Sequence, residues 1–202
     1  MFTKKLVASL SIAALILGFF SFSACRKNNV GSDEDTGYAS DHATLEKTYS
    51  DVQSIADEAG TDGTMSNYKV IPNATILSQC ATVTRDTSVS PHVLTINFGT
   101  TNCLCKDGIY RRGEIIVTYA GGYREMGHTH SITFSNYFQN DNQVMGTKTV
   151  TYANNDSLGI PEYDIVINGQ IILANNAGTI SWVSTRTRHW IAGFNTPQWN
   201  DD

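Results

Sequence analysis

Short strand-like segments separated by turn residues constrain this chain more than any other feature. From about Tyr68 onward the sequence is rich in Val, Ile, Thr, Tyr and Phe, the residue types that favour β-strands. Clusters typical of turns separate these segments, at Asp107-Gly108, Gly121-Gly122, Asn140-Asp141-Asn142, Asn154-Asn155-Asp156, Asn168-Gly169 and Asn175-Asn176. This spacing leaves no room for crossover helices, so successive strands must pair antiparallel. We therefore predict an all-β fold, an antiparallel meander or sandwich-like sheet, over residues 61–202.

Glycines stand at the start of several of these segments, as in "GEIIVTYA" from Gly113, "GTKTVTYA" from Gly146 and "GQIILA" from Gly169. A glycine at such a position indicates a β-bulge or a close approach of another part of the chain. We expect each to begin the return strand of a hairpin.

One helix is predicted, over residues 40–60. Its apolar residues recur at helical spacing and form a single amphipathic stripe, which consists of Leu45, Tyr49, Val52, Ile55, Ala56 and Ala59. Ser40 or Asp41 is suited to cap the N-terminus, and Gly60 is suited to the position just after the C-terminus. We expect the stripe to pack against the β domain.

The N-terminus has the pattern of a secretory signal. Lys4 and Lys5 precede a short apolar stretch that ends in small residues, which predicts a signal peptide over residues 1–24. The stretch "FSAC", which ends at Cys25, resembles the lipobox of bacterial lipoproteins, although Phe22 replaces the usual Leu or Val. The resemblance implies that Cys25 carries lipid, including palmitate, and anchors the mature chain. Residues 25–39 are polar and predict a flexible tether.

The remaining cysteines predict a disulfide. In the oxidising compartment to which a signal peptide leads, Cys80 is expected to pair with Cys103 or with Cys105, which leaves one thiol free. A metal or redox site at the Cys103–Cys105 pair is the alternative. Structural zinc sites use a second pair of ligands, and redox pairs usually have Cys-x-x-Cys spacing. The sequence therefore favours a structural disulfide.

Two further groups are candidates for binding. His128 and His130 are two residues apart, so on a strand both rings would lie on one face and could ligate a metal, with a third ligand from Glu125, Glu162 or His189. In the last predicted strand, alternation places Trp182, Ser184, Arg186, Arg188 and Trp190 on one face, a candidate face for sugars or carboxylates. The alternative is ordinary packing, with solvated histidines, and with arginine stems over indole rings and acidic partners on the adjacent strand.

The formal net charge and the absence of known catalytic motifs argue against several functional classes. Removal of the leader with Lys4 and Lys5 changes the formal net charge from −5 to −7, which argues against nucleic acid as a partner. The sequence contains no nucleophile elbow, phosphate loop or dinucleotide fingerprint, so we predict neither a cofactor nor catalytic residues. Candidate carboxylates for glycoside hydrolysis, such as Glu114, Glu125, Glu162 and Asp164, would be expected in any β protein.

The segments "FSAC", "NCLCKDGIYRRGEIIVTYAGGY", "SITFSNYFQNDNQVMGTKTVTY" and "SWVSTRTRHWIAGFNTPQWNDD" resemble uncharacterised β-rich lipoproteins of Bacteroidota. The resemblance implies a lipid anchor in the outer membrane, on the periplasmic or the surface side, and a chain shortened at its C-terminus. We expect a non-catalytic binding or structural module whose partners are the membrane, through the lipid, and a glycan or a protein. The alternative is an envelope hydrolase or a metal-dependent enzyme that uses His128 and His130.

Overall fold

The computed structural model describes residues 33–61, 80–123, 125–153, 155 and 158–191. By internal contacts the chain divides into two units, Met1–Tyr38 and Ala39–Asp202. Within the first unit, residues 33–38 are helical. The predicted signal peptide, the lipidation site Cys25 and residues 26–32 of the tether lie outside the described residues, as does the end of the chain after Ile191.

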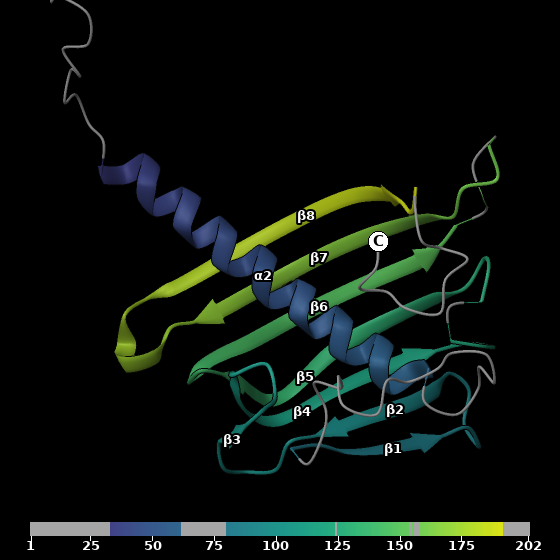
Figure 1. Cartoon of the computed structure of the whole chain (residues 1–202), viewed down its shortest axis with the longest axis horizontal. Helices are drawn as coiled ribbons and strands as arrows, with labels where there is room; N and C mark the ends of the chain where they lie inside the picture. The colour runs from purple at the N-terminus through teal and green to yellow at the C-terminus, as the bar shows by residue number, and fades with distance from the viewer. Residues whose placement is uncertain (1–32, 62–79, 124, 154, 156–157, 192–202) are drawn as a thin grey trace, which may run out of the picture. The chain divides into compact units, whose positions relative to one another are not determined.

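The predicted antiparallel sheet is confirmed (Figure 1). Its strands run in the order β1-β2-β4-β5-β6-β7-β8, each antiparallel to its neighbours, and β3 pairs with β4. The bounds are β1 Thr82–Asp86, β2 His92–Asn97, β3 Cys103–Leu104, β4 Tyr110–Tyr119, β5 Thr129–Gln139, β6 Asn142–Tyr152, β7 Glu162–Ile172 and β8 Thr179–His189, and a 3-10 turn spans Ala174–Asn176.

The turn at Asn140-Asp141 forms as predicted. Both residues have positive φ, 49° and 63°, and they connect β5 to β6 at the Gln139–Asn142 pair. Positive φ at both central residues is what a tight hairpin requires, and Asn and Asp tolerate it. The predicted turn at Asn168-Gly169 is wrong, because β7 continues through both residues and pairs with β8 without a register shift.

The helix α2 spans Asp33–Thr61 and begins seven residues before the predicted Ser40. The added segment includes Gly37 but no proline, so the helix can extend through it at a cost of only about 1 kcal/mol. Gly60 lies inside the helix rather than after it, and a side chain at this position would collide with the ring of Tyr123. The last part of the predicted tether is therefore helical.

The apolar stripe of α2 is buried as predicted. Tyr49, Val52 and Ile55 have no exposed surface, and Leu45 and Ala59 are 1–2% exposed. This stripe joins one core cluster with sheet residues such as Ile115. Burial of each large apolar side chain stabilises the fold by roughly 1.5–3 kcal/mol. Figure 1 shows the part of α2 from Ala39 onward crossing one face of the sheet diagonally.

The two faces of the sheet differ. The face toward α2 carries the buried apolar residues, including Leu94, Val117, Ile132, Val150 and Ile167. Because side chains alternate along each strand, the opposite face, here called the outer face, carries the residues between them. Among the described helices, none is long and apolar enough to cross a membrane.

Candidate functional site

The structure does not bring the two predicted metal ligands into a common site. His128 lies just before β5, with Nδ1 2.7 Å from the carbonyl oxygen of Ala120 and 3.9 Å from Glu125 Oε2. His130 is 5% exposed, stacks on Tyr123 with ring centroids 5.0 Å apart, and has Nε2 3.2 Å from Gln53 Nε2 of α2. Within the described ranges, no three His, Cys, Asp or Glu residues are grouped closely enough to hold a metal ion.

Other predicted ligands pair elsewhere. His189 Nδ1 lies 3.7 Å from Glu162 Oε2 at the far edge of the sheet. Asp164, a candidate carboxylate for glycoside hydrolysis and not a predicted metal ligand, accepts a hydrogen bond from the Thr187 hydroxyl at 2.7 Å. The observed contacts of these groups are therefore local pairs, and the histidine-based constellation does not form.

The candidate face on the last strand is partly covered by α2. Trp182 is 9% exposed, with its ring centroid 5.1 Å from that of His42 and 6.3 Å from that of Tyr49. Arg186 donates to both carboxylate oxygens of Glu46 on α2, at 2.6 and 2.7 Å. For ordinary packing, the sequence predicts an acidic partner on the adjacent strand. The observed partner of Arg186 lies on the helix instead. This half of the predicted face is therefore part of the helix–sheet interface.

The other half of that face, Arg188 and Trp190, remains accessible to solvent. Arg188 is exposed. Trp190 is half-buried, lies 6.2 Å from Tyr163 between ring centroids, and donates its backbone N–H to the Pro161 carbonyl oxygen. Trp182 and Trp190 therefore do not form one continuous open aromatic surface.

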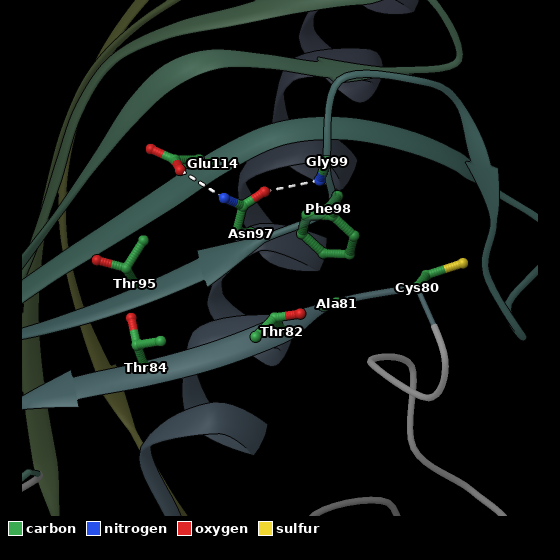
Figure 2. Close-up of a pocket in the computed structure, with 9 residues that line it drawn as sticks. All are labelled: Cys80, Ala81, Thr82, Thr84, Thr95, Asn97, Phe98, Gly99 and Glu114. Atoms are coloured by element: carbon green, nitrogen blue, oxygen red, sulfur yellow. Dashed lines mark hydrogen bonds between the residues drawn. The ribbon is translucent and has the colours of Figure 1, made fainter.

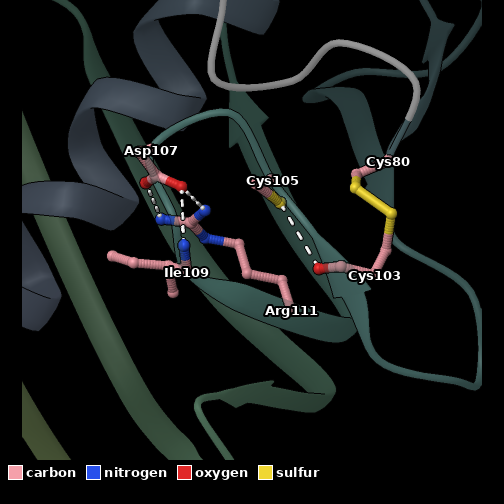
Figure 3. The surroundings of a disulfide bond; sticks show 6 residues. All are labelled: Cys80, Cys103, Cys105, Asp107, Ile109 and Arg111. Atoms are coloured by element: carbon pink, nitrogen blue, oxygen red, sulfur yellow. Dashed lines mark hydrogen bonds and ion pairs between the residues drawn. A yellow bond between two sulfur atoms is a disulfide. The ribbon is translucent and has the colours of Figure 1, made fainter.

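The disulfide joins Cys80 to Cys103, with Cα atoms 5.6 Å apart (Figure 3). It closes a separation of 23 residues and stabilises the fold by about 3 kcal/mol in the chain-entropy account. The free Cys105 is 3% exposed. Burial raises its pKa, although Arg111 acts in the opposite direction. Cys105 is therefore a protonated, buried thiol at neutral pH and not a poised nucleophile.

A fully buried arginine beside Cys105 was not predicted. Arg111 has no exposed side chain and donates to both carboxylate oxygens of Asp107, at 2.8 and 2.6 Å (Figure 3). Burial alone would raise the pKa of Asp107, but the hydrogen bonds and the charge of Arg111 hold it below its usual value. Asp107 is thus both a turn residue and the counter-ion of a core cation.

A buried lysine under α2 was also missed. Lys148 on β6 is 2% exposed and donates from Nζ to the carbonyl oxygen of Tyr49 at 3.0 Å. Burial lowers the pKa of Lys148 to about 8. The sequence contains a signal for this position, because Lys148 alternates in phase with Val144 and Val150, which also face the core.

The outer face presents hydroxyl groups in register. Thr118 of β4 pairs with Ser131 of β5, Ser131 pairs with Thr149 of β6, and the row continues through Val166 to Thr185 on β8. In the described structure, the hydroxyls of Thr118, Ser131 and Thr149 make no hydrogen bond to another protein group. Their bonding capacity is available to water or to a ligand.

A pocket of about 500 Å³ lies at the β1–β2–β4 end of the outer face (Figure 2). Thr82 and Thr84 come from β1, Thr95 and Asn97 from β2, and Glu114 from β4. The Asn97 amide donates to Glu114 Oε1 at 2.7 Å, and its carbonyl oxygen accepts from the Gly99 N–H at 2.7 Å. The pocket therefore offers hydroxyl, amide and carboxylate groups in fixed positions and has no cationic residue in its lining.

In the sequence, Glu114 is only one of several interchangeable carboxylates, and no motif predicts the pocket. Its members are two residues apart on β1 and on β2, so alternation alone places them on one face of each strand. Their meeting across strands follows from the register, in which Thr82 faces Asn97 and Asn97 faces Glu114. The chain matches no protein-family model, no curated protein and no solved structure.

Proposed function

We propose that this protein is a lipid-anchored lipoprotein of a Gram-negative cell envelope, and that its β domain is a non-catalytic binding module. The lipid on Cys25 attaches the chain to the outer membrane. The outer face of the sheet serves as the binding surface, and the disulfide fixes Cys80, just before β1, to Cys103 of β3.

The open, hydroxyl-bearing outer face is the observation that carries the proposal. A single helix suffices to bury the apolar face of the sheet, so the opposite face is not needed for packing within the described chain. It also carries a preformed pocket with the Asn97–Glu114 hydrogen bond at 2.7 Å. Polar groups that are already fixed by one another lose little conformational entropy on binding. The "FSAC" motif and the signal-like N-terminus support the anchor.

Lipid labelling tests the anchor. Cells that express the full chain are grown with an alkyne analogue of palmitate, and the Cys25→Ala variant is the control. We expect label and membrane association in the wild type and loss of both in the variant. Protease treatment of intact cells then distinguishes the surface side from the periplasmic side. Equal labelling of the two chains, or a wild type that remains in the soluble fraction, contradicts the proposed anchor.

A further inference from the structure

The charge distribution of the outer face identifies the class of ligand. Among the described strand residues, alternation places a single Lys or Arg on this face, Arg112, and Asp141 forms an ion pair with it at the β5–β6 turn. Alternation places four strand carboxylates on this face, Asp86, Glu114, Glu162 and Asp164. Asp86 accepts hydrogen bonds from Ser88, Glu162 Oε2 lies 3.7 Å from His189 Nδ1, and Asp164 accepts a hydrogen bond from Thr187. A face with hydroxyls, no free cation and a carboxylate in its pocket disfavours anionic ligands and offers acceptors to ligand hydroxyl groups.

The spacing of the polar groups suits an extended ligand. Neighbouring strands lie about 4.8 Å apart, and residues on one face of a strand recur about every 6.7 Å. The row Thr118–Ser131–Thr149 therefore places three unpaired hydroxyls over about 10 Å. A second row, Thr84–Thr95–Ile116–Thr133, lies one such repeat away and runs into the pocket.

The pocket lies at one end of the second row of hydroxyl groups. Its volume of about 500 Å³ is in the roughly 300–1,000 Å³ range of small-molecule sites. Thr82, Thr84 and Thr95 can each donate and accept, and Glu114 can accept a charge-assisted hydrogen bond on the oxygen that Asn97 does not occupy.

We infer that the outer face binds an uncharged, polyhydroxylated polymer, a neutral glycan, with one sugar unit in the pocket between Thr84, Thr95 and Glu114. This inference rests on the proposed function as a binding module and specifies its ligand class. Each hydroxyl of such a polymer can replace a water molecule on a Thr, Ser, Asn or Glu side chain of the face.

The test measures retention of the full chain, purified in mild detergent, on immobilised dextran, mannan and amylose. Heparin and polygalacturonate are the acidic comparators. The double variant Thr84→Val/Thr95→Val removes two pocket hydroxyls and keeps side-chain shape and strand preference. Thr87→Val makes the same change at an exposed residue in the turn after β1 and is the matched control. Loss of two hydrogen bonds predicts roughly a tenfold or greater fall in affinity for a neutral polymer in the double variant, and no change in the control.

Each other outcome overturns the inference. These are retention on acidic polymers alone, absence of retention on every neutral polymer, or a double variant that binds like the wild type. A dimer in analytical ultracentrifugation that the double variant dissociates would assign the face to a second copy of the chain. Circular dichroism and free-thiol counts establish that the variant is folded. Palmitate labelling scores the anchor separately, so a failed anchor and a failed ligand class are distinguishable.

Discussion

Replacement of Lys148 by methionine should stabilise the protein at neutral pH. The side chain is 2% exposed, and folding lowers its pKa from 10.5 to about 8 because burial penalises the ammonium. At about 1.4 kcal/mol per pKa unit, this corresponds to roughly 3 kcal/mol that opposes folding at pH 7. Methionine has a similar length and no charge, but it loses the hydrogen bond to the Tyr49 carbonyl oxygen. We therefore expect a net gain of about 1–3 kcal/mol.

The pH dependence of that gain identifies its cause. In the unfolded chain Lys148 titrates near 10.5, and in the folded chain it titrates at about 8. Between these values the unfolded state binds more protons, so wild-type stability from this group rises with pH. The advantage of Lys148→Met should be complete below pH 8 and shrink toward pH 10.5. The raised pKa values of buried Tyr49 and Tyr137 affect both proteins equally.

Urea unfolding at pH 7 and at pH 10, followed by tryptophan fluorescence, measures the difference. At pH 7, the variant should unfold roughly 3–10 °C higher in a thermal scan. Lys106→Met is the matched control, because Lys106 is exposed, and it should change stability by less than about 0.5 kcal/mol. A Lys148→Met protein that is less stable than wild type at pH 7, or a gain that is the same at pH 7 and pH 10, would refute the reasoning.

Three further predictions concern the sheet and its core. Gly169→Ala should destabilise the protein by about 2 kcal/mol or more in urea unfolding, because the added methyl group overlaps the Tyr49 ring. Gly37→Ala is the control, because Gly37 has open space around it, and it should be neutral or stabilising. Equal effects of the two substitutions would contradict this account. Asp107→Asn leaves Arg111 buried without a counter-ion and should cost about 3–5 kcal/mol at pH 7. Folding lowers the pKa of Asp107. The stability that this carboxylate gives the wild type is therefore lost as the pH falls through the folded-state pKa. An acid titration in which the wild type and Asp107→Asn lose stability in parallel would contradict this prediction. Cys105 should react with a thiol reagent slowly in native protein and rapidly in denaturant. Non-reducing mass spectrometry should find Cys80 linked to Cys103. A Cys80–Cys105 peptide would contradict the disulfide assignment.

The local chemistry of the chain was sufficient to predict its fold class. Turn residues such as Asn140-Asp141 and the apolar stripe through Tyr49 report directly on backbone geometry and on burial, and both predictions are confirmed. Glycine was ambiguous because it serves two purposes. At Gly169 it accommodates the Tyr49 ring inside a continuous strand, and a sequence pattern cannot distinguish that close approach from a turn.

The functional candidates depended on partners far away in sequence. Trp182 and Arg186 alternate as expected, yet His42 and Glu46 of α2 cover them. His130 faces Gln53 of the same helix. The predicted stripe indicates that α2 packs on the sheet, but it does not determine which strands the helix crosses. Side chains beneath the helix become interface, and those beyond it remain accessible.

Alternation of side chains along each strand is necessary for the hydroxyl row of the outer face. Alternation alone is not sufficient to predict that row. Period-two spacing places Thr118 with Ile116 and Glu114 on one side of β4, and Ser131 with Thr133 on one side of β5. Whether Thr118 meets Ser131 depends on register. The register is altered between Arg112 and Glu114 by a bulge, in which Gly113, with φ of 85°, lies opposite two residues of β5, Asn136 and Tyr137. A one-residue slip would bring the buried Ile132 to the outer face and turn Ser131 toward α2. The bulge glycine and the buried apolar residues of the opposite face therefore position the hydroxyl row, although none of them belongs to it.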